Sequence, residues 1–365
     1  MAKAKLKSIA VLTGGGDCPG LNAVIRAVTK TAITRYGMAV WGIQDGYLGL
    51  IEGRINPLTY EDTSNILTAG GTILGTSNTS NPFKFLVESN GKMKLKDVSG
   101  QCMANLKERG IEALACIGGD GTMASAAAFA KKGLPVIGVP KTIDNDLVGT
   151  DVTFGFDTAV TIATEAIDRI HTTAGSHHRV MIVEVMGRYA GWIALYAGAA
   201  GGADVILLPE IPYRSEAICE YVLGRSQRGK RFSIVVVSEG AREKDGEIVV
   251  RKRIANSPDP IRLGGIANKL AEDINEQTGL DCRAVVLGHV QRGGTPTPHD
   301  RTLATMLGHS AIELLATGVK NRMVVWKDGG LSSISLARVA GKIKKVPKGH
   351  PLIKAVKAIG ASFGT

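Results

Sequence analysis

The sequence predicts an α/β protein of two domains, in which mainly parallel sheets are covered by helices on both faces. Three observations carry this prediction. The chain has 365 residues, well above the roughly 150 residues of a usual domain. Apolar runs of strand length recur along it, and most precede segments with helical spacing. These runs are continuous rather than alternating, as in parallel strands that are buried on both faces.

The first expected strand is the run Ser8–Thr13, which ends in the turn GGGDCPG. A helix is expected next, because apolar residues recur at helical spacing from Leu21 to Ala32, and Gly37 can end it. Further strands are expected at Met38–Ile43, Ala113–Ile117, Pro135–Val139, Val180–Val185, Val205–Leu208, Ile234–Val237 and Ala284–Leu287.

Charge and composition exclude some classes of function. Lys and Arg number 44 against 33 Asp and Glu, so the net charge is +11 with neutral histidines. The basic residues form no single block and do not interleave with aromatic residues, so nucleic-acid binding is not expected. An anionic small substrate and a solvated surface both remain open. A small basic cluster near the C-terminus is interpreted as a solvated helix end: Lys342, Lys344, Lys345 and Lys348.

Targeting and redox signals are weak. The five cysteines include no C-x-x-C pair, so neither a zinc site nor a disulfide framework is expected. The N-terminal segment lacks the apolar core of a signal peptide, and no run approaches the roughly 18 apolar residues of a membrane span. The sequence therefore predicts a cytoplasmic protein without a membrane partner.

The candidate site is sought directly after the strands, because ligands of parallel sheets bind at the carboxyl ends. Two glycine-rich turns, Gly14–Gly20 and Gly118–Thr122, each open a helix whose backbone N–H groups could bind phosphate. Neither turn matches the dinucleotide fingerprint or the P-loop. Asp120 could hold Mg²⁺ or cap the helix, and the presence of two such turns favours the phosphate interpretation.

The loop Pro140–Asp146 crowds a lysine, a threonine and two aspartates after a third expected strand. Phosphoryl transfer needs a carboxylate that accepts the proton of the attacking hydroxyl, together with a metal and cations. An Asp-rich surface turn is the alternative.

Three strand ends in the second half carry arginines, a glutamate and a histidine, in Met186–Gly191, Ser238–Gly240 and Gly288–Gly294. Arginine suits a phosphate and glutamate accepts from sugar hydroxyls. Single residues of this kind are more often structural, but the set indicates a sugar-phosphate half beside a nucleotide or polyphosphate half. The two halves together predict a kinase built without a P-loop.

The motifs at these strand ends resemble those of the 6-phosphofructokinase family. The matching segments run in family order from about Gly15 to Arg301: GGDCPGLNAVIRA, GYLGL, GGTILGTS, IGGDGT, PKTIDND, GFDTA, VEVMGRYAGW, LLPE, SEG and LGHVQRGGTPTPHDR. The resemblance implies two Rossmann-like domains that transfer the γ-phosphoryl group of ATP, with Mg²⁺, to the 1-hydroxyl of fructose 6-phosphate in glycolysis. It also implies an allosteric homotetramer.

The resemblance further implies a nucleotide-binding domain of residues 1–154 and about 290–325. A fructose 6-phosphate-binding domain is implied for residues 155–289 and 326–365. By the same resemblance, Asp144 is the catalytic base, Thr142 and Arg188 support the transferring group, and Asp120 holds Mg²⁺. The nucleotide is expected at Gly16, Gly119, Asp120, Gly121 and Thr122.

The sugar phosphate is expected, again by resemblance, at Thr142, Asp144, Arg179, Met186, Gly187, Arg188, Glu239, Arg283, His289 and Arg292. Glu239 is expected to bind hydroxyls, and His289 and Arg292 the 6-phosphate. Arg179 and Arg283 match positions that reach across a subunit interface, so the active sites are expected to be shared between subunits.

Departures from the family pattern bear on the phosphoryl donor. Asn78 stands where the family often has arginine, and Lys84 is a candidate replacement. The family's pyrophosphate users usually have aspartate where this chain has Gly121, and lysine where it has Lys141. Aspartate at position 121 would occupy the space of the α-phosphate of ATP and repel it. Gly121 therefore favours ATP, whereas Lys141 suits either donor.

Two further departures concern regulation. His171 and Tyr60 fall where bacterial effector sites have arginines, although Arg26 and Lys230 resemble members of that site. Fewer cations predict weak activation by ADP. Two other functions stay open: a lipid or NAD kinase, which the GGDG turn alone resembles, and a non-catalytic sensor of sugar phosphate or nucleotide.

Overall fold

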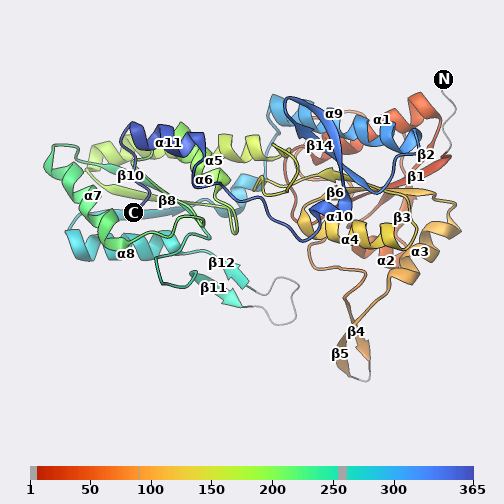
Figure 1. Cartoon of the computed structure of the whole chain (residues 1–365), viewed down its shortest axis with the longest axis horizontal. Coiled ribbons are helices and arrows are strands. Elements are labelled where there is room, and N and C mark those ends of the chain that lie inside the picture. The colour runs from red at the N-terminus through yellow and green to blue at the C-terminus, as the bar shows by residue number, and fades with distance from the viewer. Residues whose placement is uncertain (1–5, 90, 254–260) are drawn as a thin grey trace. The chain divides into compact units, whose positions relative to one another are not determined.

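The computed structural model describes residues 6–89, 91–253 and 261–365. The chain divides into two compact units, each assembled from segments that are distant in sequence (Figure 1). Unit 1 comprises the chain up to Ile143 together with Leu147–Asp157 and Arg292–Lys342. Unit 2 comprises Asp144–Asp146, Thr158–Gln291 and Ile343–Thr365. No helix among the described residues combines the length and the apolar character that a membrane span requires.

Unit 1 is built on a seven-stranded sheet with the order β15-β14-β7-β6-β1-β2-β3. Its inner strands are parallel, and only the outermost strand at each edge, β3 or β15, pairs antiparallel. The strands are β1 (Ser8–Gly14), β2 (Ala39–Ile43), β3 (Ile55–Pro57), β6 (Ala113–Gly118), β7 (Val136–Pro140), β14 (Arg322–Lys327) and β15 (Gly330–Ser335). Every residue of β1, β6 and β7 is buried, which explains why these strands read as unbroken apolar runs.

Helices cover both faces of this sheet (Figure 1). On one face α1 (Leu21–Tyr36) packs against α9 (Pro298–Ala316). On the other face four helices enclose an apolar core with the sheet: α2 (Tyr47–Glu52), α3 (Ser99–Glu108), α4 (Asp120–Lys131) and α10 (Leu336–Val339). The expected helix after the first turn is confirmed as α1, and Gly37 ends it in the left-handed conformation at φ 64°.

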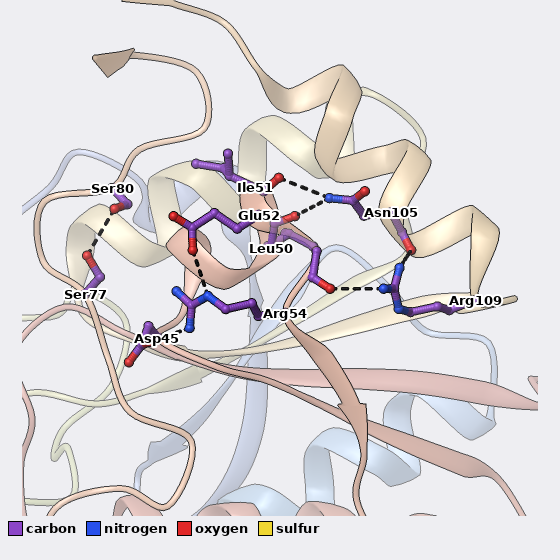
Figure 2. A network of polar contacts seen from close by, with 10 residues as sticks. Asp45, Leu50, Ile51, Glu52, Arg54, Ser77, Ser80, Asn105 and Arg109 are labelled. Atoms are coloured by element: carbon purple, nitrogen blue, oxygen red, sulfur yellow. Dashed lines mark hydrogen bonds and ion pairs between the residues drawn. The ribbon is translucent and has the colours of Figure 1, made fainter. Parts of the chain in front are cut away.

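A short hairpin, β4 (Phe85–Ser89) and β5 (Lys92–Lys96), also belongs to this part of the chain. The junction of α2 and α3 is polar, because Asn105 donates to the carbonyl oxygens of Leu50 and Ile51 at 2.8 and 3.1 Å (Figure 2). These bonds satisfy carbonyl groups that the end of a helix leaves without partners.

The predicted domain boundary near residue 325 differs from the division in the structure. Strand β14 pairs in parallel with β7, and β15 extends the same sheet through an antiparallel turn. The chain therefore stays in unit 1 as far as Lys342. The β15 sequence GLSSIS lies at an edge and is largely polar, so it lacks the apolar run by which the buried strands were predicted.

Unit 2 contains a four-stranded, wholly parallel sheet with the order β13-β8-β10-β9. Its strands are β8 (Val180–Val185), β9 (Val205–Leu207), β10 (Ser233–Ser238) and β13 (Cys282–Val286). One face packs on α7 (Ser215–Gln227) and α8 (Ile266–Thr278). On the other face lie α5 (Phe156–His177), α6 (Trp192–Ala200) and α11 (Pro351–Ala358) (Figure 1). A separate hairpin is formed by β11 (Val250–Arg253) and β12 (Ile261–Leu263).

A buried carboxylate joins β8 to α8. Glu184 is 2% exposed, although ionisable residues are rarely buried without partners. Its oxygens accept hydrogen bonds from the backbone N–H groups of Gly265 and Ala267, both at 3.0 Å. The first N–H groups of a helix lack partners within the helix, and a negative charge is favourable there. Glu184 therefore fixes the start of α8 against the end of β8.

We expect Glu184→Ala to lower the free energy of unfolding by about 1–3 kcal/mol, because two backbone donors lose their acceptor. Glu184→Gln keeps one acceptor oxygen and should lose less. Urea unfolding measures both, with the exposed Glu272→Ala on the same helix as the control, for which a change within about 0.5 kcal/mol is expected. Equal values for Glu184→Ala and Glu272→Ala would show that the buried carboxylate does not stabilise the helix junction.

Candidate active site

The three polar turns that follow β1, β6 and β7 begin side by side because the register of the sheet aligns the ends of these strands. Gly14 at the end of β1 pairs with Gly118 at the end of β6, and Gly118 pairs with Pro140 at the end of β7. The turns that follow these strands therefore share one edge of the sheet, as expected for a parallel arrangement.

Glycines at this edge leave room for one threonine side chain. A Cβ atom at Gly14 would lie 2.6 Å from Thr122 Oγ1, and one at Gly118 would lie even closer to that side chain. Any larger residue at either position would displace Thr122. Since Thr122 lies in the first turn of α4, which begins at Asp120, this packing brings the N-terminus of the helix against both strands. Backbone N–H groups at such a helix terminus suit a phosphate.

Two cationic side chains stand beside the first glycine-rich turn. The Lys141 ammonium donates to the carbonyl oxygen of Gly16 at 2.5 Å, and Arg292 donates to that of Asp17 at 3.0 Å. A Cβ at Gly16 would lie 2.7 Å from Arg292 Nη1, so a larger residue there would shift this guanidinium. The two cations favour a polyphosphate at this turn. The contact to Asp17 places Arg292 in unit 1, and its role toward the 6-phosphate stays a prediction.

Asp120 is the expected Mg²⁺ ligand. It is partly buried at the start of α4, and one of its oxygens accepts from the N–H of Gly341 at 2.8 Å. Burial raises the pKa of this carboxyl group. No three His, Cys, Asp or Glu side chains gather as a metal site in the described part of the chain. A single carboxylate nevertheless fits Mg²⁺, which is usually held by one or two carboxylates, phosphate oxygens and water.

Gly121 faces open space. A Cβ atom built on it meets no heavy atom within 4 Å, and its backbone is not in the left-handed region. Cys18, in the first glycine-rich turn, is buried, and desolvation raises the pKa of its thiol to about 12, so it is no nucleophile. Asn78 and Lys84 are both exposed, and the replacement of the family arginine by Lys84 stays a prediction.

The segment Thr72–Ser77 contacts the first glycine-rich turn, Gly14–Gly20. None of its residues was predicted as a site residue. Gly15 donates its N–H to Ser77 O at 3.1 Å, and the Thr76 hydroxyl donates to Gly15 O at 2.6 Å. The segment is anchored at Asp45, whose N–H donates to Leu74 O at 2.8 Å.

Arg54 in turn holds Asp45. Its guanidinium binds the carboxylates of Asp45 and Glu52 at 2.5 and 2.7 Å, in the network that Figure 2 shows. The network therefore supports, through Asp45, the segment that contacts the first glycine-rich turn at Gly15.

The strand ends of unit 2 surround a cavity of about 480 Å³. Three of the expected substrate residues line it: Met186 after β8, Glu239 after β10 and His289 after β13. Their side chains come from three neighbouring strands, and Leu263, Gly264 and Asn268 near the start of α8 complete the wall. A cavity of this size with a carboxylate and an imidazole suits a small polar molecule such as a sugar phosphate.

Hydrogen bonds join the turns around this cavity. The Ser238 hydroxyl and the Gly240 N–H both donate to the carbonyl oxygen of Gly187, at 2.5 and 3.2 Å. Gly187 has φ 135°, and a Cβ there would lie 2.5 Å from the Ser238 oxygen, so glycine is required. Arg188 follows, with its guanidinium 4.8 Å from the centre of the Tyr189 ring.

Gln291 was not predicted as a site residue. It is fully buried, its amide oxygen accepts from the N–H of Met186 at 3.3 Å, and its amide nitrogen donates to Gly288 O at 3.0 Å. It thereby ties the turn that carries His289 to the turn that carries Met186. The sequence offers one signal, its position between His289 and Arg292, two residues that were predicted for the site.

The TIDND loop contributes to both units. Thr142 belongs to unit 1, where its carbonyl oxygen accepts from the Thr153 hydroxyl at 2.7 Å, and Asp144 belongs to unit 2. Both side chains are partly buried. Gly119 precedes α4 as its N-cap residue.

Arg179 and Arg283 lie apart from the cavity. Both form ion pairs with Asp281, Arg179 at 2.6 Å. Arg179 directly precedes β8 and Arg283 is the second residue of β13, so both stand at the amino ends of strands whose carboxyl ends line the cavity. A strand of six residues spans roughly 17 Å. The structure therefore does not bring these two arginines to the cavity of their own unit.

The positions expected to differ from bacterial effector sites have local partners. His171 Nε2 lies 2.7 Å from the carbonyl oxygen of Gly201, to which the ring donates. Tyr60 lies under the ammonium group of Lys30, 3.3 Å from the ring centre. Weak activation by ADP stays a prediction.

Sequence comparisons identify relatives over nearly the whole chain. A model of the family described as Phosphofructokinase matches residues 8–315. The ATP-dependent 6-phosphofructokinase 2 of Clostridium perfringens is 56% identical over 363 residues, 98% of each chain. The ATP-dependent 6-phosphofructokinase of Spirochaeta thermophila is 49% identical, over 100% of this chain and 99% of its own. The pyrophosphate–fructose 6-phosphate 1-phosphotransferase of Amycolatopsis methanolica is also 49% identical, over 93% and 96%.

Solved structures of phosphofructokinases are also similar to this chain. Phosphofructokinase from Saccharomyces cerevisiae superposes with a TM-score of 0.79 at 31% identity; the match covers 91% of this chain and only 45% of the yeast chain. A pyrophosphate-dependent phosphofructokinase from Marinobacter aquaeolei, at 23% identity and a TM-score of 0.78 over 98% of this chain and 88% of that one, shares the fold. The predicted family and the two-domain α/β fold are both confirmed, and the chain belongs to the phosphofructokinase family.

Proposed function

We propose that this protein phosphorylates fructose 6-phosphate on its 1-hydroxyl, with ATP and Mg²⁺, to form fructose 1,6-bisphosphate. The observation that carries the proposal is that a glycine-lined, cationic strand edge in unit 1 accompanies a sugar-sized cavity with Glu239 and His289 in unit 2. Relatives named ATP-dependent 6-phosphofructokinase, up to 56% identical over nearly the full chain, support it. The reaction belongs to glycolysis, and we place it in the cytoplasm.

Unit 1 would bind the donor. Backbone N–H groups at Gly119–Thr122 and the turn at Gly16 bind its phosphates, and Lys141 adds a positive charge. Asp120 would hold Mg²⁺, which neutralises charge on the phosphate oxygens when bound. Thr142, one residue beyond Lys141, supports the transferring group.

Unit 2 would bind the acceptor and supply the base. Glu239 accepts hydrogen bonds from sugar hydroxyls, and His289 binds the 6-phosphate. Arg292, which belongs to unit 1, keeps its predicted role toward the 6-phosphate. Arg188 stabilises the charge of the transferring group. Asp144 accepts the proton of the 1-hydroxyl as that oxygen attacks the γ-phosphorus and the bond to the β-phosphate oxygen breaks.

We infer the donor from one position, because overall similarity does not distinguish ATP from pyrophosphate. Relatives named for ATP and for pyrophosphate stand at the same 49% identity. A Cβ atom on Gly121 would meet no heavy atom within 4 Å, which supports room for the α-phosphate and nucleoside of ATP, whereas pyrophosphate needs no such space. Turnover of fructose 6-phosphate measured with each donor tests the proposal. Higher kcat/KM with pyrophosphate would favour the pyrophosphate-dependent enzyme, and turnover with neither would leave a non-catalytic sensor.

We expect Gly121→Asp to reduce kcat/KM for ATP by at least about tenfold, because a carboxylate there crowds and repels the α-phosphate. Gly121→Ala is the matched control: the space around the residue accommodates a methyl group, so the fold and the use of ATP should persist. Steady-state kinetics with both donors measures the effect. If Gly121→Asp used ATP as well as the parent does, Gly121 would not determine the donor.

Asp144→Asn should keep the fold and lower kcat by about 10²–10⁴-fold, because an amide cannot accept the proton of the hydroxyl. Thermal unfolding verifies the fold, and a coupled assay measures kcat. Near-normal turnover in the folded variant would exclude Asp144 as the base.

We propose a homotetramer whose active sites are completed by Arg179 and Arg283 of a neighbouring subunit. The distance of these arginines from the cavity of their own unit supports this. Mixing two inactive variants, Asp144→Asn and Arg179→Ala, should then restore part of the activity, because some hybrid sites contain both native residues. Mass spectrometry verifies subunit exchange. No recovery after verified exchange would mean that each chain holds a complete site.

A further inference from the structure

The sequence predicted that the whole basic cluster near the C-terminus is solvated, but the structure differs at one residue. Lys342, Lys345 and Lys348 are exposed, but Lys344 is partly buried. Lys344 lies in the segment Ile343–Val346, which belongs to unit 2 together with the loop Asp144–Asp146. No catalytic or binding role was assigned to this segment.

Lys344 contacts the two residues that follow the proposed base. Its backbone N–H donates to the carbonyl oxygen of Asp146 at 2.7 Å. Its ammonium group donates to the Asn145 side-chain oxygen at 3.0 Å. The same residue thus holds the loop through both its main chain and its side chain.

The loop has a backbone conformation that needs such support. Asn145 is 4% exposed and adopts φ 50°, in the left-handed region that non-glycine residues rarely occupy. Asparagine tolerates this conformation better than most residues. A residue in a sparsely populated conformation persists when its surroundings determine it, and the ammonium of Lys344 is part of those surroundings.

Further contacts fix Lys344 and the residues that follow it. The Trp192 indole N–H donates to the carbonyl oxygen of Lys344 at 3.0 Å, and the ammonium lies 5.3 Å from the centre of the Trp192 ring, within the range of a cation–π contact. Glu210 accepts from the N–H groups of Val346 and Gly191 at 2.8 and 3.1 Å. The segment is therefore attached to the start of α6, directly after the turn that carries Met186 and Arg188.

We propose that Lys344 is a positioning residue for Asp144. Through its contacts with Asn145 and Asp146, Lys344 holds the proposed base in place relative to the turn of the unit 2 cavity that carries Met186 and Arg188. The inference rests on the proposed function. Lys344 acts through the loop and not on the substrate, so its loss should affect the chemical step more than binding. A misplacement of a reacting group by about 1 Å can cost about 10²-fold in rate.

Lys344→Met removes the ammonium and keeps the length of the side chain. We expect kcat to fall about 10- to 100-fold, with KM for fructose 6-phosphate and for ATP changed less than about twofold. Lys344→Arg keeps a cationic donor and should recover part of kcat. The control is Lys345→Met, which removes an equal charge from the exposed neighbour and should leave kcat and the melting temperature unchanged.

A second variant tests the route through Asn145. Asn145→Gly removes the side-chain acceptor and tolerates the left-handed conformation. In this background Lys344→Met should have little further effect on kcat, because the two residues form one interaction. If Lys344→Met alone did not fold, the kcat of Asn145→Gly would carry the test, and a normal value would contradict the proposal.

The outcomes distinguish a failure of the proposed function from a failure of the positioning role of Lys344. A parent protein without turnover of fructose 6-phosphate would overturn the proposed function, and with it this inference. An active parent with normal kcat in Lys344→Met would overturn the inference alone. So would equal losses in Lys344→Met and Lys345→Met, or full additivity with Asn145→Gly.

Discussion

The close approach of β1 and β6 around one threonine is the constraint on which the glycine-rich edge of unit 1 depends. Gly14 and Gly118 are paired in register, and neither position has room for a Cβ atom beside Thr122. Only with that space can α4 begin directly at the edge, where a Cβ atom on Gly119 would lie 3.5 Å from the carbonyl oxygen of Lys141. The glycines at this edge thus leave space for a side chain and for the start of a helix.

In unit 2, polar side chains determine how the turns at the strand ends are positioned. Its sheet is wholly parallel, so three turns meet around one cavity, but polar side chains rather than glycines set their positions. Gln291 joins the turns of Met186 and His289, and Glu184 fixes the start of α8, whose first residues help to close the cavity. Buried polar groups of this kind stabilise only when their partners are in place, which makes the cavity sensitive to residues that need not touch the substrate.

Phosphoryl transfer depends chiefly on positioning and electrostatics, so the groups that hold the reacting residues matter as much as the reacting residues. Arg54 acts on the first glycine-rich turn through Asp45 and the segment Thr72–Ser77, and Lys344 acts on the TIDND loop through Asn145. Part of the positive charge of this protein therefore orders loops, because Arg54 binds a loop carboxylate and Lys344 donates to a loop amide.

The sequence by itself determined the buried strands other than β14, the helix from Leu21, the family and the residue types at each strand end, because continuous apolar runs and glycine-rich turns are local signals. It did not reveal the polar edge strand β15, the true extent of unit 1, the support given by Gln291 and Glu184, or the difference between Lys344 and Lys345. Those features depend on partners far away in the chain: Lys344 meets Asn145 across about two hundred residues, and Arg292 meets Asp17 across 275. Only the tertiary structure decides such pairings, since a hydrogen bond between distant residues leaves no periodic trace in the sequence.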